Sequence, residues 1–261
     1  MKFVHLKAVV GAMALSVALA GTAQAQITSA TSDSAKVQIG ESNVVGGPHT
    51  AGKVGIWVPA LPTTPTRLFV DFQGLQGTAT PTANIVTTVN NPTGTITDHS
   101  QYGRFDFSKV DGYTVYYGEW SQTGSASAGD HTVYFGGTGA STDAAVNGLT
   151  GTAVNYNVYG LSNYAGNGQL NGTLTANFVA DTLTGSIQSG NYKVDIGTAD
   201  IIGSTIDGID AEAFTVSGGV PTSVATNGVV SGQFFGSAAQ ALAGIVEFSN
   251  RQYDTAFGGK Q

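Results

Sequence analysis

The chain has 261 residues, no cysteine and a formal net charge of −7. Only 10% of its residues are charged, against about 25% in an ordinary soluble domain, and this scarcity of Glu, Lys and Arg disfavours long surface helices. The acidic balance argues against nucleic acid as a partner, because binding a phosphate backbone needs cationic side chains. The abundant glycine, 37 residues, predicts sheets with many tight turns.

Residues 1–25 have the pattern of a secretory signal peptide. Lys2 and Lys7 make the start positive, Ala8–Ala20 is apolar, and Ala23-Gln24-Ala25 fits an A-x-A cleavage site. A membrane anchor is the alternative interpretation, but the apolar stretch is short compared with the roughly 20 residues of a membrane-spanning helix. We therefore expect a secreted protein from which this segment has been removed.

Residues 26–151 form one compositional region, which we expect to be a β-rich ligand-binding domain. Residues 26–40 are polar and rich in Ser and Thr, and we expect them to be a loosely ordered lead-in. Further on, strand-like apolar runs alternate with long polar stretches, notably Thr87–Ser100 and Ser121–Asp130. Long loops on a rigid sheet often carry binding function.

Residues 152–261 show the period-two patterning of β-strands. Leu170, Leu174 and Phe178 alternate with polar residues, and glycine recurs in the same inward-facing series, as the interior of a small barrel requires. The predicted fold class is all-β, an N-terminal β-rich clamp domain followed by an eight-stranded antiparallel β-barrel. A β-sandwich is the alternative for the second region.

No set of residues supports catalysis. The chain has no cysteine nucleophile, no G-x-S-x-G elbow with a histidine downstream and no H-E-x-x-H motif. Gly258-Gly259-Lys260 is no P-loop, because no helix follows it. The acidic residues Asp207, Asp210 and Glu212 fit a solvated surface better than an acid–base pair. We expect a binding protein and not an enzyme.

Three histidines lie outside the signal peptide, and the N-terminal region holds them all: His49, His99 and His131. A surface or hydrogen-bonding role is the plain interpretation of each one alone. Zinc would need three or four His, Cys or carboxylate ligands, and Asp98 and Asp130 adjoin two of the histidines. Haem iron would need one or two neutral imidazoles in an apolar, aromatic slot.

The same region supplies side chains for such a slot. Lys53 and Arg104 are near His49 and His99 in sequence and could meet haem propionates. The aromatic residues could line the slot, or they could form an ordinary sheet core. They are Tyr102, Phe105, Phe107, Tyr113, Tyr116, Tyr117, Trp120, Tyr134 and Phe135.

The C-terminal region resembles a known family. The run Val230–Gly244, VSGQFFGSAAQALAG, is similar to the G-x-F-Y/F-G-x-x-A-x-x-L-x-G signature that closes the barrels of transferrin-binding-protein-B-like proteins. Val158–Leu161, Gly172–Phe178 and Thr182–Ile187 precede it in the family's order. That family includes the substrates of Slam-type outer-membrane translocators, the type XI secretion system, so the resemblance implies that the barrel is recognised for translocation.

The N-terminal region adds a narrower resemblance. His99–Phe107 and Tyr116–Ser121 look like the N-terminal clamp of Slam-dependent proteins, most of which are lipoproteins with a cysteine after the signal peptide. This chain lacks that cysteine and is similar to the released hemophores of the hemophilin type. The resemblance implies haem b bound in the clamp through histidine, capture of haem outside the cell, host haemoglobin as a source, and delivery to a TonB-dependent outer-membrane receptor.

The resemblance does not fix which histidines ligate the iron. We expect His49 and His131 on opposite sides of the haem, since both flank tight turns next to strands, with His99 as the replacement for either. Tyr102, Tyr134, Arg104 and Lys53 are the expected pocket residues. The alternative is a host-protein-binding, adhesin-like protein of the same architecture with no cofactor, and a zinc-binding protein is a weaker third interpretation.

Overall fold

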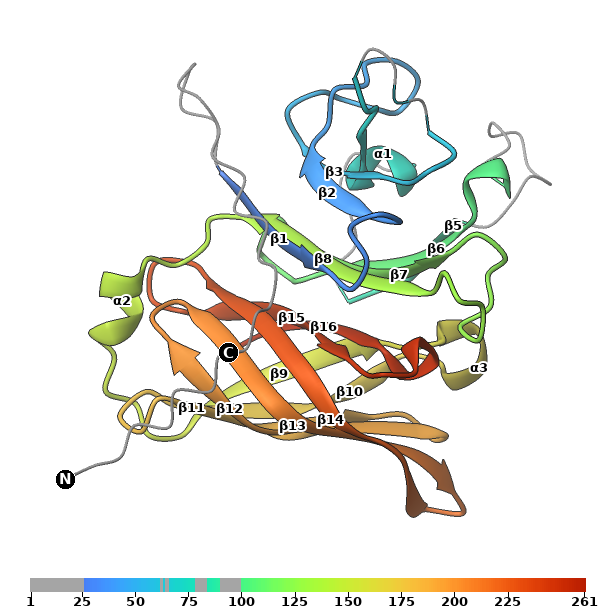
Figure 1. Ribbon diagram of the computed structural model, residues 1–261. Coiled ribbons are helices and arrows are strands. Elements are labelled where there is room, and N and C mark those ends of the chain that lie inside the picture. Colours follow the sequence, from blue (N-terminus) through green and yellow to red (C-terminus); the bar gives the residue numbers. More distant parts are fainter. Residues whose placement is uncertain (1–25, 62, 64–65, 78–83, 90–99) are drawn as a thin grey trace.

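The structure, a computed structural model, is drawn in Figure 1 and describes residues 26–61, 63, 66–77, 84–89 and 100–261. The predicted signal peptide lies outside the described residues, and so do His99 and Asp98. Within the described ranges the chain forms a barrel and two smaller sheets. No helix in these ranges is long and apolar enough to cross a membrane.

The C-terminal region forms a closed antiparallel barrel of eight strands. Consecutive strands pair from β9 to β16, and β16 pairs back with β9 to close the ring. The all-β class and the eight-stranded barrel are thereby confirmed, and the β-sandwich alternative is wrong. The strands are β9 (Val154–Leu161), β10 (Leu170–Asn177), β11 (Thr182–Gln188), β12 (Tyr192–Ile202), β13 (Thr205–Ser217), β14 (Val220–Phe235), β15 (Ala241–Glu247) and β16 (Thr255–Lys260).

The interior of the barrel follows the period-two pattern. On β10, Leu170 and Leu174 are buried, whereas Asn171 and Thr173 are exposed. Gly172 lies where neighbouring strands come close, because a Cβ atom there would be 2.1 Å from the carbonyl oxygen of Ser186. A larger residue would force strands β10 and β11 apart, which explains the glycine in the pattern.

A five-stranded antiparallel sheet covers one side of the barrel, in the order β1-β8-β7-β6-β5 (Figure 1). The expectation of a loosely ordered lead-in over residues 26–40 is wrong, because most of these residues lie in strands β1 and β2 or the turn between them. Strand β1 pairs with β8 along its whole length. The strands of the sheet are β1 (Ile27–Thr31), β5 (Thr87–Val89), β6 (Arg104–Lys109), β7 (Val115–Ser121) and β8 (Thr132–Thr138).

A third layer lies on the far side of this sheet (Figure 1). The ring of Phe72 anchors it, stacking on Tyr116 at 4.8 Å and on Tyr134 at 5.8 Å between ring centroids. Because Tyr116 and Tyr134 belong to the sheet, this contact fixes the start of helix α1 against it. The layer consists of β2 (Gln38–Glu41), β3 (Val54–Trp57), β4 (Val70–Asp71) and α1 (Phe72–Leu75).

The opposite face of the five-stranded sheet packs on the barrel. Tyr117 of β7 and Phe135 of β8 share an apolar cluster with Phe235 and Ile245 of the barrel. The rings of Phe135 and Phe235 meet edge to face, with centroids 6.5 Å apart. The boundary at residues 151/152 stays a prediction. The connecting elements are η1 (Ser100–Tyr102), α2 (Asp143–Asn147), α3 (Tyr164–Asn167) and η2 (Arg251–Tyr253).

Candidate functional site

The loop between β2 and β3 holds His49 against the start of helix α1. The backbone N–H of His49 donates to the carbonyl of Gly46 at 3.1 Å and closes a tight turn. Gly47 in this turn has a φ of +56°, a conformation that favours glycine. The turn places the imidazole, 13% exposed, beside the carboxylate of Asp71, the last residue of β4.

The Asp71 carboxylate is 1% exposed and accepts hydrogen bonds from three donors. As the N-cap of α1 it accepts the backbone N–H of Gly74 at 2.6 Å. It also accepts the backbone N–H of Thr50 at 2.9 Å, and its Oδ2 lies 3.1 Å from Nδ1 of His49. Because an ionised carboxylate only accepts, this contact places the ring proton on Nδ1.

In the neutral ring, this proton position leaves the other nitrogen of His49 with a lone pair. Within the described part of the chain, no group hydrogen-bonds to Nε2. Histidines that ligate metals commonly donate their second ring N–H to a carboxylate, which sets the tautomer and the ring orientation. His49 therefore has the geometry of a metal ligand.

Gly74 makes the close contact between helix and ring possible. A Cβ atom on Gly74 would lie 2.3 Å from Nδ1 of His49 and 2.9 Å from Oδ2 of Asp71. Any side chain at this position would push the ring away from the carboxylate. His49 could be found from the sequence, but Asp71 and Gly74 could not, because their roles depend on contacts across the loop.

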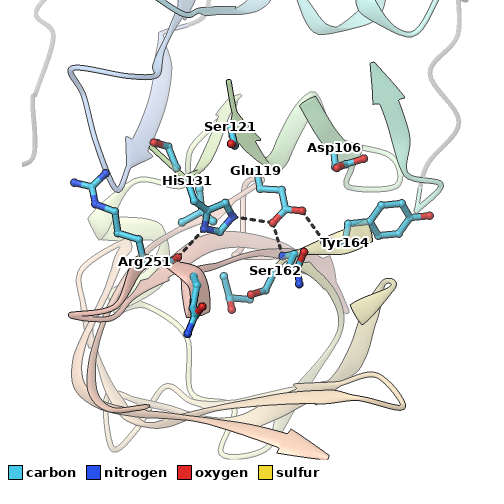
Figure 2. A network of polar contacts seen from close by, with 12 residues as sticks. Asp106, Glu119, Ser121, His131, Ser162, Tyr164 and Arg251 are labelled. Carbon is cyan, nitrogen blue, oxygen red and sulfur yellow. Dashed lines mark hydrogen bonds and ion pairs between the residues drawn. The ribbon is translucent and has the colours of Figure 1, made fainter. Parts of the chain in front are cut away.

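His131 has a different environment at the start of β8. Figure 2 shows its ring between Glu119 of β7 and the backbone of Arg251 in η2. Nδ1 lies 2.6 Å from the carbonyl oxygen of Arg251, and Nε2 lies 3.0 Å from Oε2 of Glu119. Both partners can only accept, so both ring nitrogens donate and neither has a lone pair for a metal.

Burial by itself lowers the pKa of His131, but the hydrogen bond and charge of Glu119 outweigh it, with further support from the Arg251 carbonyl and from Asp254. The pKa of His131 is raised above its usual value as a result. The ring, in a residue only 2% exposed, is held as an imidazolium. His131 therefore serves in a polar network between the sheet and the barrel.

Glu119 is the centre of that network (Figure 2). Besides His131, its carboxylate accepts the backbone N–H groups of Asn163 and Tyr164, each at 2.6 Å. These two residues begin α3 in the barrel region, whereas Glu119 is on the sheet. The network therefore fastens the two parts together at one end of their interface, and sequence patterning gave no sign of it.

The two histidines expected to share one haem are not brought together. His49 belongs to the layer beyond the five-stranded sheet, whereas His131 contacts Arg251 on the barrel side. The sheet lies between these two layers (Figure 1). His99, the expected replacement, lies outside the described residues.

The expected pocket residues are also dispersed. The guanidinium of Arg104 pairs with Asp106, with Nε and Oδ2 2.6 Å apart. Tyr134 is fully buried in the core that surrounds Phe72, whereas Tyr102 is partly exposed and Lys53 is exposed on the loop of His49. Of the two cations expected near the haem, Lys53 lies on the same loop as His49, whereas Arg104 lies on β6.

The zinc site considered as a weaker interpretation would need three or four ligands close together. No cluster of three or more His, Cys, Asp or Glu side chains arranged for a metal occurs among the described residues. Asp130 accepts hydrogen bonds from the Ser121 hydroxyl and the Gln122 N–H, each at 3.0 Å. The carboxylate beside His131 therefore orders a loop of the sheet.

The donor set around His49 fits haem iron on one side of the ring. It offers one imidazole lone pair, fixed by a buried carboxylate, at a partly exposed position. Val45, 81% exposed, adds apolar surface to the same loop. A flat, largely apolar ligand with a central metal can use both features.

Comparisons with known proteins show the family of the chain. A family model described as the HphA N-terminal heme-binding domain matches residues 22–132, and one described as the HphA C-terminal domain matches residues 149–261. The apo crystal structure of the haemoglobin receptor HpuA from Kingella denitrificans is similar with a TM-score of 0.55 at 16% identity, covering 92% of this chain and 87% of that one.

Transferrin binding protein B from serogroup B Neisseria meningitidis is similar at 15% identity with a TM-score of 0.48, and the match covers 74% of this chain and 37% of that one. Likeness to HpuA at such low identity shows a shared fold. The family models are more specific, since between them they match both the region that carries His49 and the barrel. The chain therefore belongs to the HphA, or hemophilin, family, and its N-terminal region is a haem-binding domain.

Proposed function

We propose that this protein is a secreted hemophore that captures haem b outside the cell without chemical turnover, and that His49 binds the iron through Nε2. One observation carries the assignment of the ligand. His49 donates Nδ1–H to the buried Asp71 and keeps Nε2 without a partner among the described residues, within the region matched by the heme-binding family model.

His131 takes no part in ligation in this proposal, because both of its ring nitrogens donate hydrogen bonds. His99 then becomes the candidate for the second axial position. Lys53 is the proposed partner of a haem propionate, since it is exposed on the same loop, whereas Arg104 is already paired with Asp106. Tyr102 remains a candidate for the pocket wall.

The haem would stay bound mainly through burial of its apolar ring area, with the iron–imidazole bond fixing its position. When bound, the haem supplies the iron that accepts the imidazole lone pair. The protein's own task is to hold the ring of His49 still and to keep the proton of the neutral ring on Nδ1. Asp71 and the turn at Gly46 and Gly47 do this.

Secretion and delivery complete the proposal. The predicted signal peptide and the resemblance to Slam-dependent proteins support passage through a Slam-type outer-membrane translocator. We expect haem to be handed to a TonB-dependent outer-membrane receptor, with host haemoglobin as a source. The shared fold with HpuA is consistent with a protein that acts outside the cell.

The test is a haem titration of the secreted chain, followed by the Soret band. We expect a stoichiometric complex in the wild type and a weaker, spectrally altered one in His49→Ala and in His99→Ala. In Lys53→Ala we expect weaker binding with an unaltered Soret band, because the lost contact is to a propionate and not to the iron. A wild-type protein that forms no such complex but captures a host serum protein would favour the adhesin-like alternative.

A further inference from the structure

The buried carboxylate behind His49 points to a selectivity that ligation alone does not give. We propose that Asp71 is a positioning residue that strengthens His49 as an electron-pair donor, so that the site takes haem preferentially in its ferric state. This inference rests on the proposed function. Beyond that function, the site would prefer one oxidation state of the haem iron, and Asp71 would set this preference through His49 without touching the haem.

The first step is the fixed direction of the carboxylate. One oxygen of Asp71 accepts the N–H of Gly74 at 2.6 Å, and the other accepts the N–H of Thr50 at 2.9 Å. Both donors are backbone groups, one in helix α1 and one in the loop of His49. The carboxylate therefore has one orientation, and Nδ1 of His49 meets it at 3.1 Å.

The second step is the effect of this contact on the ring. A carboxylate that accepts the Nδ1–H bond draws the proton toward itself and leaves more negative charge on the imidazole, which makes Nε2 a stronger donor. The carboxylate of Asp71 is 1% exposed, so water screens the interaction little. Among the described residues, no cation forms an ion pair with this carboxylate that would offset its charge.

The third step is the difference between the two iron states. Ferric and ferrous haem differ by one electron, and a donor with more negative charge stabilises the more positive iron more strongly. Axial ligation and the hydrogen bonds behind it are known means by which proteins set haem potentials. The pair of His49 and Asp71 should therefore lower the reduction potential of the bound haem.

The experiment compares the wild type with Asp71→Asn. Asparagine is as good an N-cap as aspartate, so helix α1 should keep its cap and the variant should fold. Asp143→Asn is the matched control, because it removes a carboxylate that accepts hydrogen bonds from Ser204 in the barrel region, far along the chain from the His49 loop.

Two readouts are needed. In the haem-free protein, ¹⁵N NMR should show His49 protonated on Nδ1 in the wild type and a shift toward the other tautomer in Asp71→Asn. In the complexes, ferric haem affinity should fall about 10- to 100-fold in Asp71→Asn, as for other partners behind a ligand. In the same variant, the loss of affinity for ferrous haem should be about tenfold smaller than the loss for ferric haem. This difference raises the one-electron reduction potential of the bound haem by ~59 mV.

Asp71→Glu, which keeps the charge, should restore part of the lower potential. Equal potentials in the wild type and Asp71→Asn, or a wild-type His49 protonated on Nε2 in the haem-free protein, would overturn the inference. These outcomes are distinct from failure of the proposed function, in which the wild type binds no haem or His49→Ala binds it as tightly as the wild type.

Discussion

Two histidines of this chain show how hydrogen-bond partners decide what a side chain can do. His49 has one acceptor, the Asp71 carboxylate, so its neutral ring keeps one nitrogen with a lone pair. His131 has two acceptors, Glu119 and the carbonyl of Arg251, and so keeps none. Both flank tight turns next to strands, so the local sequence does not distinguish them. Contacts between distant residues do.

Gly74 offers a direct test of the His49 geometry. In Gly74→Ala the new methyl group would overlap the ring of His49, because a Cβ atom there would lie 2.3 Å from Nδ1. We expect haem affinity to fall by about tenfold or more, as when other supporting contacts of a ligand are lost. Circular dichroism should show an unchanged fold, since alanine suits a helix better than glycine.

Gly148→Ala is the matched control for this variant. Gly148 is the C-cap of α2 at a φ of −82°, and a Cβ atom there would make only ordinary contacts of 3.4 Å and beyond. Its haem titration should match that of the wild type. Equal affinity in Gly74→Ala and Gly148→Ala would contradict the placement of His49 against α1.

His131 predicts a pH-dependent contribution to stability. Its pKa is raised in the folded protein, because Glu119 and the Arg251 carbonyl outweigh the effect of burial. The contribution is therefore fully present below the unfolded pKa of about 6.5, and it is lost as the pH rises through the raised folded value. His131→Gln should cost about 3 kcal/mol of unfolding free energy at pH 6.

The measurement is urea unfolding of the wild type and His131→Gln at a series of pH values from 6 to 10. The difference between the two should shrink as the pH rises, because the wild type then loses the charge that the variant lacks. A difference that stays constant or grows toward high pH would show that His131 is neutral in the folded protein.

At the scale of the element, the strands of the barrel could be predicted from local patterning. Strands that form only by pairing with a distant segment could not. The alternation on β10 is visible in the sequence and is matched by buried Leu170 and Leu174. Strand β1 has no alternation of buried and exposed residues, and each of its residues is at least partly exposed. It becomes a strand through pairing with β8, where Ile27 lies opposite Thr138.

Removing residues 26–31 tests the contribution of β1. The deletion leaves one edge of β8 without its hydrogen-bonding partner, so amide hydrogens of β8 should exchange faster with solvent, by about tenfold for each 1.4 kcal/mol of local stability lost. Amides of β10–β13 in the barrel should keep their protection. Unchanged exchange in β8 would contradict the pairing.

At the scale of the whole molecule, one sheet serves two cores. One face of the sheet packs on the layer that carries His49, and the other packs on the barrel, where Tyr117 meets the cluster of Phe235. The network of Glu119 and His131 joins sheet and barrel at one end. The haem-binding region therefore rests on the barrel through both apolar and charged contacts.

Much of this architecture could be predicted from the sequence, and less of the site. The strands of the barrel follow from period-two patterning, which is a local property, whereas closure depends on the pairing of β9 with β16 at the two ends of the region. His49 could be named because histidines are rare in the chain. Asp71, Glu119 and Arg251 could not, since a carboxylate or a carbonyl becomes a partner only when folding brings distant segments within hydrogen-bond distance.

The central claim is that Nε2 of His49 binds the haem iron, and chemical rescue tests it most directly. His49→Gly removes the imidazole but leaves the space for it, so added imidazole can enter and bind the iron. We predict that His49→Gly binds haem weakly with an altered Soret band, and that imidazole restores the wild-type spectrum in a saturable manner. A variant that keeps the wild-type spectrum without imidazole, or one that imidazole leaves unchanged, would contradict the assignment.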